Sequence, residues 1–350
     1  MIEARGLTRT FRAGNETVEA VRGLDLDVRK GEMVAVLGPN GAGKSTTLRM
    51  LTTLLQPTAG TARVVGRDVT VDPAGVRSRI GYIGQGNSAG HSQRVLHELV
   101  AQGRCYGLGR REAARRGDAL LTALDLRGLG DRTVSSLSGG QRRRLDVALG
   151  MVHRPALLFL DEPSTGLDPQ NRANLQSQIE RLRADHGTTI VLTTHYLDEA
   201  DAMADRVVVV DHGTVIADDT PERLKADLAG DHIVITAARV ADAPTVAAVI
   251  ERTGAASRCQ ATGAVVTARV QGGATLIPGL LRDLDRAGVG VAAAEVSRPT
   301  LDDVFLALTG RSLREGGDAE PAETPDLPGD GVARAAVPDA SDLVLLEKAS

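Results

Sequence analysis

Cysteine is scarce in this chain of 350 residues, which has only Cys105 and Cys259. The two lie far apart and outside any Cys-x-x-Cys spacing, which excludes a disulfide framework and a cysteine zinc site. The seven histidines show neither His-x-x-x-His nor His-Glu-x-x-His spacing, so we expect no structural metal. A reducing compartment fits this composition best.

Long apolar runs are also missing. No stretch approaches the roughly 18 consecutive apolar residues that a membrane-spanning helix requires. Residues 1–11, MIEARGLTRTF, carry charges where a signal peptide has its apolar region, so we expect a soluble chain without a leader. The net charge is −4 with acidic and basic residues interspersed, and this pattern does not favour nucleic acid as a partner.

The apolar residues that are present follow the pattern of an α/β protein. Leu24, Leu26 and Val28 alternate with charged residues, which predicts a half-buried antiparallel strand near the start of the chain. Continuous apolar runs follow, separated by segments with helical spacing, and these predict a buried, mostly parallel sheet. The runs are Met33–Leu37, Leu157–Leu160, Thr189–Leu192 and Val207–Val210.

The length and the changes of pattern divide the chain further. At about 150 residues per domain, the length predicts two domains with an extra segment. Helical spacing replaces the strand signal over about 86–150, which predicts a helical subdomain inserted into an α/β core that spans 1–225. Strands and helices start again at Asp231 and predict a small C-terminal α/β domain over 231–310. The acidic, proline-containing segment 311–350 predicts a disordered tail.

A phosphate-binding loop is the most specific motif. GPNGAGKS, at 38–45, fits G-x-x-x-x-G-K-[ST], follows the strand MVAVL and precedes a helical pattern. The glycines allow the backbone amides to cradle phosphates, Lys44 neutralises their charge, the Ser45 hydroxyl binds Mg²⁺, and Thr46 adds a donor. The residues predicted to contact the nucleotide are Gly38, Pro39, Asn40, Gly41, Ala42, Gly43, Lys44, Ser45 and Thr46.

Polar residues end three apolar strands, and the carboxyl ends of such strands face the ligand in nucleotide-binding α/β proteins. After LLFL, Asp161 is expected beside Mg²⁺, and Glu162 is the natural general base for an attacking water. His195 ends TTIVLTTH and is expected to donate to the γ-phosphate. Gln85 ends the short apolar stretch IGYIGQ. It is either a donor to the water or the metal, or an ordinary loop amide.

Two further features leave alternatives open. Phe11, at the end of the first strand, either stacks on adenine or belongs to the core. LSGGQRRRLD, at 137–146, opens a helix with small polar residues, so Ser138, Gly139 and Gly140 present donors to an anion. Three arginines follow: Arg142, Arg143 and Arg144. Either they strengthen an interface electrostatically, or at least two of them form a solvated helix face.

Over residues 1–225 the set of motifs resembles the ATP-binding cassette (ABC) ATPases. GPNGAGKST matches Walker A, Gln85 the Q-loop, LSGGQ the signature, LLFLDE Walker B, STGLD the D-loop and His195 the switch histidine, in the family's order. The resemblance implies a homodimer in which two cassettes pair head to tail around ATP. Ser138, Gly139, Gly140, Gln141 and Asp168 would then contact nucleotide across the dimer, and Ser45, Gln85 and Asp161 would hold Mg²⁺.

The segments RRRLDVALGMVHRPALLFLDEPSTGLDP and RPTLDDVFLALTG resemble the drug-exporter branch that includes the daunorubicin-resistance ATPases. That resemblance implies antibiotic efflux, a separate multi-spanning permease and a peripheral place at the cytoplasmic face of the membrane. One departure concerns the permease contact: His97-Glu98-Leu99 stands where the branch usually has Glu-Asn-Leu. It is either loop drift or an altered partner specificity.

The sequence therefore predicts an ATP-hydrolysing subunit of an ABC exporter. Other ABC systems, either importers or exporters of other cargo, share every catalytic residue and stay open as alternatives. A soluble ABC ATPase that serves the ribosome or DNA is disfavoured, because the chain has one Walker A motif, no long heptad run and an acidic balance.

Overall fold

The amino-terminal residues form an antiparallel sheet. The computed structural model describes residues 1–13, 16–86, 88–254, 256–270 and 272–310, which belong to one unit. The strands β1 (Ile2–Ala13), β2 (Glu16–Val28), β4 (Ala59–Val64) and β5 (Arg67–Asp68) are ordered β2-β1-β4-β5. Leu24, Leu26 and Val28 are all at most 3% exposed, so the predicted alternation of buried and charged residues is confirmed.

A second sheet carries the predicted apolar runs. Its order is β10-β9-β3-β8-β7-β6, and the five strands from β9 to β6 are parallel. Every residue of β3, β7 and β8 is buried, as expected for strands covered on both faces. The α/β class is confirmed. The strands are β3 (Met33–Leu37), β6 (Ile80–Ile83), β7 (Leu157–Asp161), β8 (Thr189–Thr194), β9 (Arg206–Asp211) and β10 (Thr214–Asp219).

Helices join these strands. The longest of them, α6, presents Leu175, Ile179 and Leu182 to the core at helical spacing. Asp168 caps its first turn, and Gly187 ends it in the left-handed conformation. The helices are α1 (Lys44–Leu51), α2 (Pro73–Arg77), α6 (Pro169–His186), α7 (Leu197–Met203) and α8 (Pro221–Leu224).

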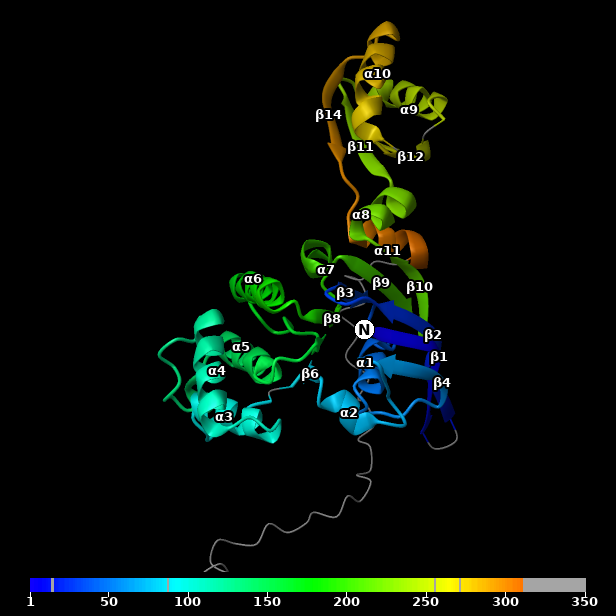
Figure 1. Cartoon of the computed structure of the whole chain (residues 1–350). Coiled ribbons are helices and arrows are strands. Elements are labelled where there is room, and N and C mark those ends of the chain that lie inside the picture. Colours follow the sequence, from blue (N-terminus) through cyan, green and yellow to red (C-terminus); the bar gives the residue numbers. More distant parts are fainter. Residues whose placement is uncertain (14–15, 87, 255, 271, 311–350) are drawn as a thin grey trace, which may run out of the picture. The chain divides into compact units, whose positions relative to one another are not determined.

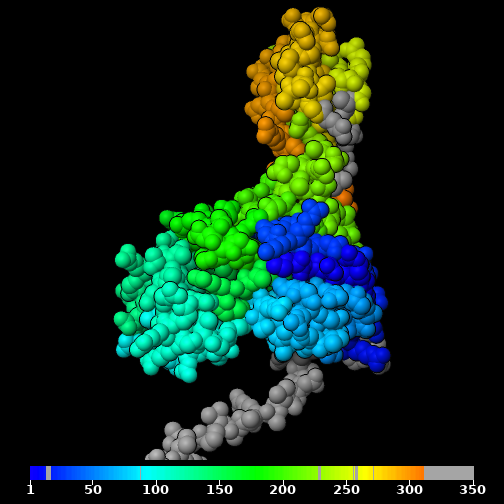
Figure 2. Space-filling view, in the orientation of Figure 1, coloured from blue at the N-terminus to red at the C-terminus, as the bar shows by residue number. Residues whose placement is uncertain are grey.

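Between β6 and β7 the chain is helical. The helices α3 (Val95–Cys105), α4 (Arg110–Ala123) and α5 (Gly139–Met151) lie together in Figure 1. In the space-filling view of Figure 2 their atoms, cyan to green, gather in one lobe. The short turn η1 (Val134–Ser136) precedes α5 in the chain. Leu99, Leu121 and Leu145 come from the three helices and share one core cluster with residues of the central sheet.

The C-terminal elements form a third sheet with its own core. Strands β11 (Asp231–Ala237), β12 (Ala256–Thr262), β13 (Val265–Val270) and β14 (Val291–Ser297) are ordered β12-β13-β11-β14. Ile235, Val246 and Leu284 belong to a cluster that is separate from the other two. The remaining elements here are η2 (Lys225–Ala229), η3 (Val240–Asp242), α9 (Ala243–Arg252) and α10 (Gly273–Arg286).

The last described helix, α11 (Leu301–Thr309), packs elsewhere than the sequence suggests. Its position in the sequence assigns it to the accessory domain, but Leu301, Val304 and Phe305 belong to the same core cluster as Met203 and Leu224 of the ATPase core. The apolar face of α11 therefore anchors the end of the accessory segment on the core. The predicted acidic tail, 311–350, lies outside the described residues.

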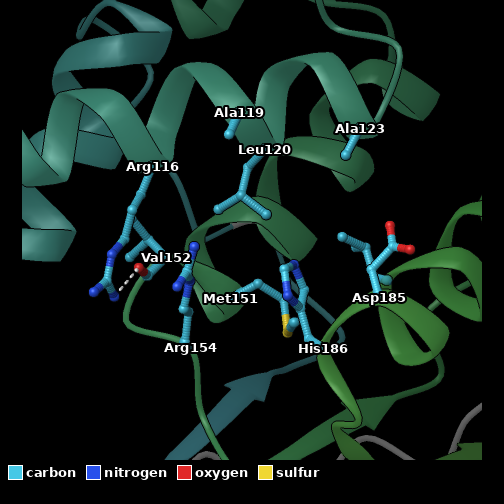
Figure 3. A pocket seen from close by; sticks show the side chains of 10 residues that line it. Arg116, Ala119, Leu120, Ala123, Met151, Val152, Arg154, Asp185 and His186 are labelled. Atoms are coloured by element: carbon cyan, nitrogen blue, oxygen red, sulfur yellow. Dashed lines mark hydrogen bonds between the residues drawn. The ribbon is translucent and has the colours of Figure 1, made fainter.

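A hollow of about 220 Å³ lies where α4, the end of α5 and the end of α6 meet. Figure 3 shows Arg116, Arg154 and His186 around it, together with the apolar side chains of Leu120 and Met151. None of the residues predicted to contact nucleotide lines it. The candidate site is at the carboxyl edge of the central sheet instead. Within the described ranges, no helix combines the length and the apolar character that crossing a bilayer requires.

Candidate functional site

The phosphate-binding loop joins β3 to α1, as predicted. Lys44 is buried, and its Nζ donates hydrogen bonds to the carbonyl oxygens of Gly38 at 2.7 Å and Pro39 at 3.0 Å. Burial lowers the pKa of Lys44, and the carboxylates of Glu162 and Asp161 oppose that shift. The loop therefore surrounds the ammonium group of Lys44, which is positioned to bind phosphate.

Two glycines of the loop are required by close backbone contacts. A Cβ on Gly38 would lie 2.2 Å from the Val210 carbonyl oxygen. Gly43, with φ 99°, would place a Cβ 2.4 Å from the Ala20 carbonyl oxygen. Asn40 and Gly41 at the tip are exposed, Ala42 is buried, and Thr46 is half-buried on the first turn of α1.

Ser45 and Asp161 meet at the edge of the sheet. The Ser45 Oγ donates to Asp161 Oδ1 at 2.8 Å, and Gln85 Nε2 donates to the same Ser45 Oγ at 3.3 Å. Asp161 is 1% exposed and also accepts a 2.7 Å bond from Thr193 Oγ1. The structure thus brings together the three predicted metal ligands. A carboxylate, a hydroxyl and an amide oxygen are the hard donors that Mg²⁺ prefers, so the residues fit the ion when the Gln85 amide turns its oxygen in place of Nε2 toward Ser45.

Glu162 follows Asp161 in a strained conformation. Its φ is 47°, in the left-handed region that residues other than glycine rarely occupy. Its backbone N–H is held by both Thr193 oxygens, at 3.1 Å from the carbonyl and 3.0 Å from the hydroxyl. The turn directs the Glu162 side chain back toward the loop, where Oε1 lies 3.8 Å from Lys44 Nζ.

The charges around Glu162 keep its carboxylate ionised. His195 Nδ1 lies 3.3 Å from Glu162 Oε2, and Thr165 Oγ1 donates to the same oxygen at 3.2 Å. Burial by itself would raise the pKa of Glu162, but the His195 ring and the Lys44 charge outweigh it and hold the pKa below its ordinary value. An ionised carboxylate is able to accept a proton at neutral pH.

Comparison with known proteins decides the family. The family model described as "ABC transporter" matches residues 21–165. The daunorubicin resistance ATP-binding protein DrrA3 of Streptomyces coeruleorubidus is 43% identical over 85% of this chain and 93% of its own length. The daunorubicin/doxorubicin resistance ATP-binding protein DrrA of Streptomyces peucetius is 41% identical over 92% of this chain and 96% of its own.

This chain belongs to the ABC transporter ATP-binding proteins. It is an ATPase that binds ATP, and the predicted resemblance to the daunorubicin-resistance ATPases is confirmed. A solved ATP-binding cassette, a dimer in a post-hydrolysis state bound to ADP and Pi, matches the fold with a TM-score of 0.59 and 23% identity. That match covers 63% of this chain and 98% of the solved cassette. The predicted ABC-type core is confirmed.

The signature of this cassette, Leu137–Gln141, is at the start of α5, where Ser138 and Gly139 are exposed and Leu137 and Gly140 are buried. Ser138 and Gln141 form a reciprocal cap: Ser138 Oγ accepts from the Gln141 N–H at 3.3 Å, and Gln141 Oε1 accepts from the Ser138 N–H at 3.0 Å. Gln141 therefore uses its side-chain oxygen within the helix start. Gly139 is exposed, and a Cβ on Gly140 would lie 2.7 Å from the Asn171 side-chain oxygen.

Two other residues predicted to contact nucleotide have local partners. Asp168, in the D-loop, caps α6 through bonds from the Asn171 N–H at 2.8 Å and Asn171 Nδ2 at 2.6 Å, which lower the pKa of Asp168. Phe11 is half-buried, and the Arg9 guanidinium lies 4.7 Å from the centre of its ring. Phe11 is therefore not a core residue, and one of the sequence alternatives is wrong.

The three arginines that follow the signature separate into two kinds. Arg142 and Arg144 are partly exposed on α5. Arg143 is only 7% exposed and donates to backbone carbonyls of the cassette itself. Neither alternative drawn from the sequence, an interface or a solvated face, describes Arg143.

Three groups around the site were not predicted from the sequence: Thr193 and Glu199, which are buried, and Tyr82, which is half-buried. Thr193 bonds to both Asp161 and Glu162, as described above. Glu199 on α7 is 1% exposed and accepts bonds from Ser164 Oγ at 3.0 Å and Thr194 Oγ1 at 2.6 Å. Tyr82 places its hydroxyl 3.5 Å from Asp161 Oδ2. The two threonines at the end of an otherwise apolar strand were the one visible signal.

Proposed function

We propose that this chain is the ATP-hydrolysing subunit of an antibiotic exporter and that it drives a separate membrane permease. The observation that carries the proposal is the convergence of Lys44, Ser45, Asp161, Glu162 and His195 at one edge of the central sheet. Relatives that align over nearly their whole length are named for resistance to daunorubicin and doxorubicin, which supports the export of drugs as the purpose of hydrolysis.

The residues divide the chemistry of hydrolysis among them. Mg²⁺, when bound by Ser45, Asp161 and Gln85, would neutralise charge on the β- and γ-phosphates. Lys44 exchanges its bonds to the Gly38 and Pro39 carbonyls for phosphate oxygens of the substrate. Glu162, kept ionised by its neighbours, orients the attacking water and accepts its proton. His195, beside Glu162, donates to the γ-phosphate.

The signature at the start of α5 is proposed to contact the nucleotide held by a second copy of this chain. Ser138 and Gly139 are exposed, and the Ser138 and Gln141 side chains cap their own helix. The cap does not use the N–H groups of Gly139 and Gly140, which lie at the positive end of the helix dipole and would donate to the γ-phosphate held by another cassette. The pairing is isologous, and ATP stabilises the closed homodimer until hydrolysis removes that contact.

The permease is the proposed membrane partner, and the cassette works at the cytoplasmic face of the membrane. His97 and Glu98 lie on the first turns of α3, in the segment where the family's cassettes meet their permeases. The test is affinity purification of tagged Glu162→Gln protein from detergent-solubilised membranes, with ATP and Mg²⁺ or without nucleotide, followed by mass spectrometry. Stoichiometric recovery of a multi-spanning protein supports the proposal. Recovery of ribosomal or DNA-bound partners from the soluble fraction contradicts it.

A further inference from the structure

Arg143 reaches two separate parts of the active site from the helix that the signature opens. Its Nε donates to the Pro163 carbonyl oxygen at 2.7 Å, and its Nη1 donates to the Gly84 carbonyl oxygen at 2.8 Å. Its Nη2 lies 3.2 Å from the Asp161 carbonyl oxygen and 3.3 Å from that of Glu162. One buried guanidinium thus spans the end of the Walker B strand and the residue before Gln85.

The three carbonyls of residues 161–163 belong to the strained turn. Glu162 is held at φ 47°, and such a conformation persists only where surrounding contacts determine it. Thr193 holds the N–H of this turn, and Arg143 holds its carbonyls. A planar fork with five donors is suited to several acceptors at once, whereas the single ammonium of a lysine is not.

Asp146, one turn further along α5, holds the other side of the Q-loop. It is fully buried, its Oδ2 lies 3.9 Å from Arg143 Nη1, and its Oδ1 accepts a 3.0 Å bond from the Ser88 N–H. Gly84 and Ser88 flank Gln85, whose amide contacts Ser45. The Arg143 and Asp146 pair therefore joins α5 to both ends of the Q-loop and to the turn that carries Glu162.

We propose that Arg143 is a positioning residue that transmits the state of the signature helix to Glu162 and Gln85, with Asp146 as its buried counter-charge. This inference rests on the proposed function, in which Glu162 is the general base and a second copy engages the signature. A shift of α5, when that copy docks on Ser138, moves carbonyls that Arg143 bonds, and so it reaches the Glu162 turn. Arg143 touches no predicted phosphate contact, so its loss affects turnover rather than ATP affinity.

The test compares Arg143→Met and Arg143→Lys with Arg115→Met in the full chain. Arg115 is a matched control, because its side chain is 76% exposed on α4 and pairs only with Glu112 among the described contacts. We expect Arg143→Met to lower kcat by about 10-fold or more with the Kd for ATP within about 2-fold of wild type. Arg143→Lys should recover part of the loss, and Arg115→Met should match wild type. An unchanged kcat, or equal losses in kcat and ATP affinity, overturns the inference.

A second comparison separates this inference from the proposed function. Single-turnover hydrolysis is measured for Glu162→Gln with and without Arg143→Met. Because three of its four carbonyl contacts are to residues 161–163, Arg143 acts mainly through Glu162, and the double variant should hydrolyse ATP no more than about 2-fold slower than Glu162→Gln alone. Independent, multiplying losses overturn the inference, whereas near wild-type hydrolysis by Glu162→Gln overturns the proposed function itself. If Arg143→Met does not fold, the same comparison with Arg143→Lys, alone and combined with Glu162→Gln, tests the inference.

Discussion

Ser45 Oγ donates a 2.8 Å hydrogen bond to Asp161 Oδ1, although 116 residues separate the two in the chain. The parallel register makes this possible, because β3 and β7 both flank β8 and end at the same edge of the sheet. The hydroxyl donates to the carboxylate that would share Mg²⁺ with it. This pair defines where Mg²⁺ fits and leads to the first prediction.

Asp161→Asn should raise the Mg²⁺ concentration for half-maximal ATPase activity by about 10-fold or more, because the substitution removes the only carboxylate among the predicted ligands. Titration of the ATPase rate with Mg²⁺ at saturating ATP measures this. Asp131→Asn is the control, since the Asp131 side chain is 96% exposed. Identical Mg²⁺ dependence in Asp161→Asn and wild type would contradict the assignment of Asp161.

Glu162→Gln should lower the rate of ATP hydrolysis by about 10²–10⁴-fold while ATP binding is preserved, because an amide cannot accept the proton of the attacking water. Steady-state phosphate release and equilibrium nucleotide binding measure the two properties separately. Thr165→Ala is an informative companion, since it removes only a 3.2 Å bond to Glu162 Oε2. Hydrolysis by Glu162→Gln within a few-fold of wild type would exclude the general-base role.

Phe305→Ala should destabilise the ATPase core by about 3–5 kcal/mol, because the ring is 1% exposed within the cluster that contains Met203 and Leu224. Unfolding is followed with and without ATP. ATP binding shifts the unfolding transition of the ATPase core, and the free energy of that transition is the quantity measured. Leu306→Ala, at a neighbouring side chain that is 37% exposed, should cost less than about 1 kcal/mol. Equal effects of the two substitutions would mean that α11 does not anchor on the core.

Glu199→Gln should flatten the dependence of stability on pH. Burial raises the pKa of Glu199 above its ordinary value of 4.5, and the bonds from Thr194 and Ser164 only partly oppose this. A raised pKa favours the folded state fully below pH 4.5, and that contribution is lost as pH rises through the folded-state value. The unfolding free energy of Glu199→Gln minus that of wild type should therefore increase from pH 4.5 upward in denaturant titrations. If the unfolding free energies of the two proteins change in parallel with pH, this prediction for Glu199 is wrong.

The site was predictable because its signals are local. The glycines and Lys44 within one loop, and Asp161 and Glu162 at the end of one apolar strand, each define a chemistry without knowledge of distant contacts. The buried partners were not predictable in this way. Arg143 looks like its exposed neighbours in the sequence, and only the carbonyls of Gly84 and Pro163, brought from other segments, explain why it turns inward.

The same limit applies to packing. The spacing of apolar residues predicts that α11 is a helix with one buried face, but periodicity does not say which core covers that face. The structure places Phe305 against the ATPase core rather than the accessory sheet. Glu199 is a comparable case, because a charged residue on a short helix reads as exposed until Ser164 and Thr194 supply its hydrogen bonds.

Mixing two inactive variants tests whether the signature of one copy completes the nucleotide site of another. Lys44→Met removes the phosphate contact, and Ser138→Arg places bulk and charge at the signature, so each variant alone should be inactive and Ser138→Arg should not dimerise with ATP. In an equimolar mixture, a head-to-tail heterodimer has one intact site, which predicts recovery of about a quarter of the wild-type ATPase rate. If the mixture stays as inactive as its components, the signature does not act on a partner's nucleotide and the head-to-tail homodimer is excluded.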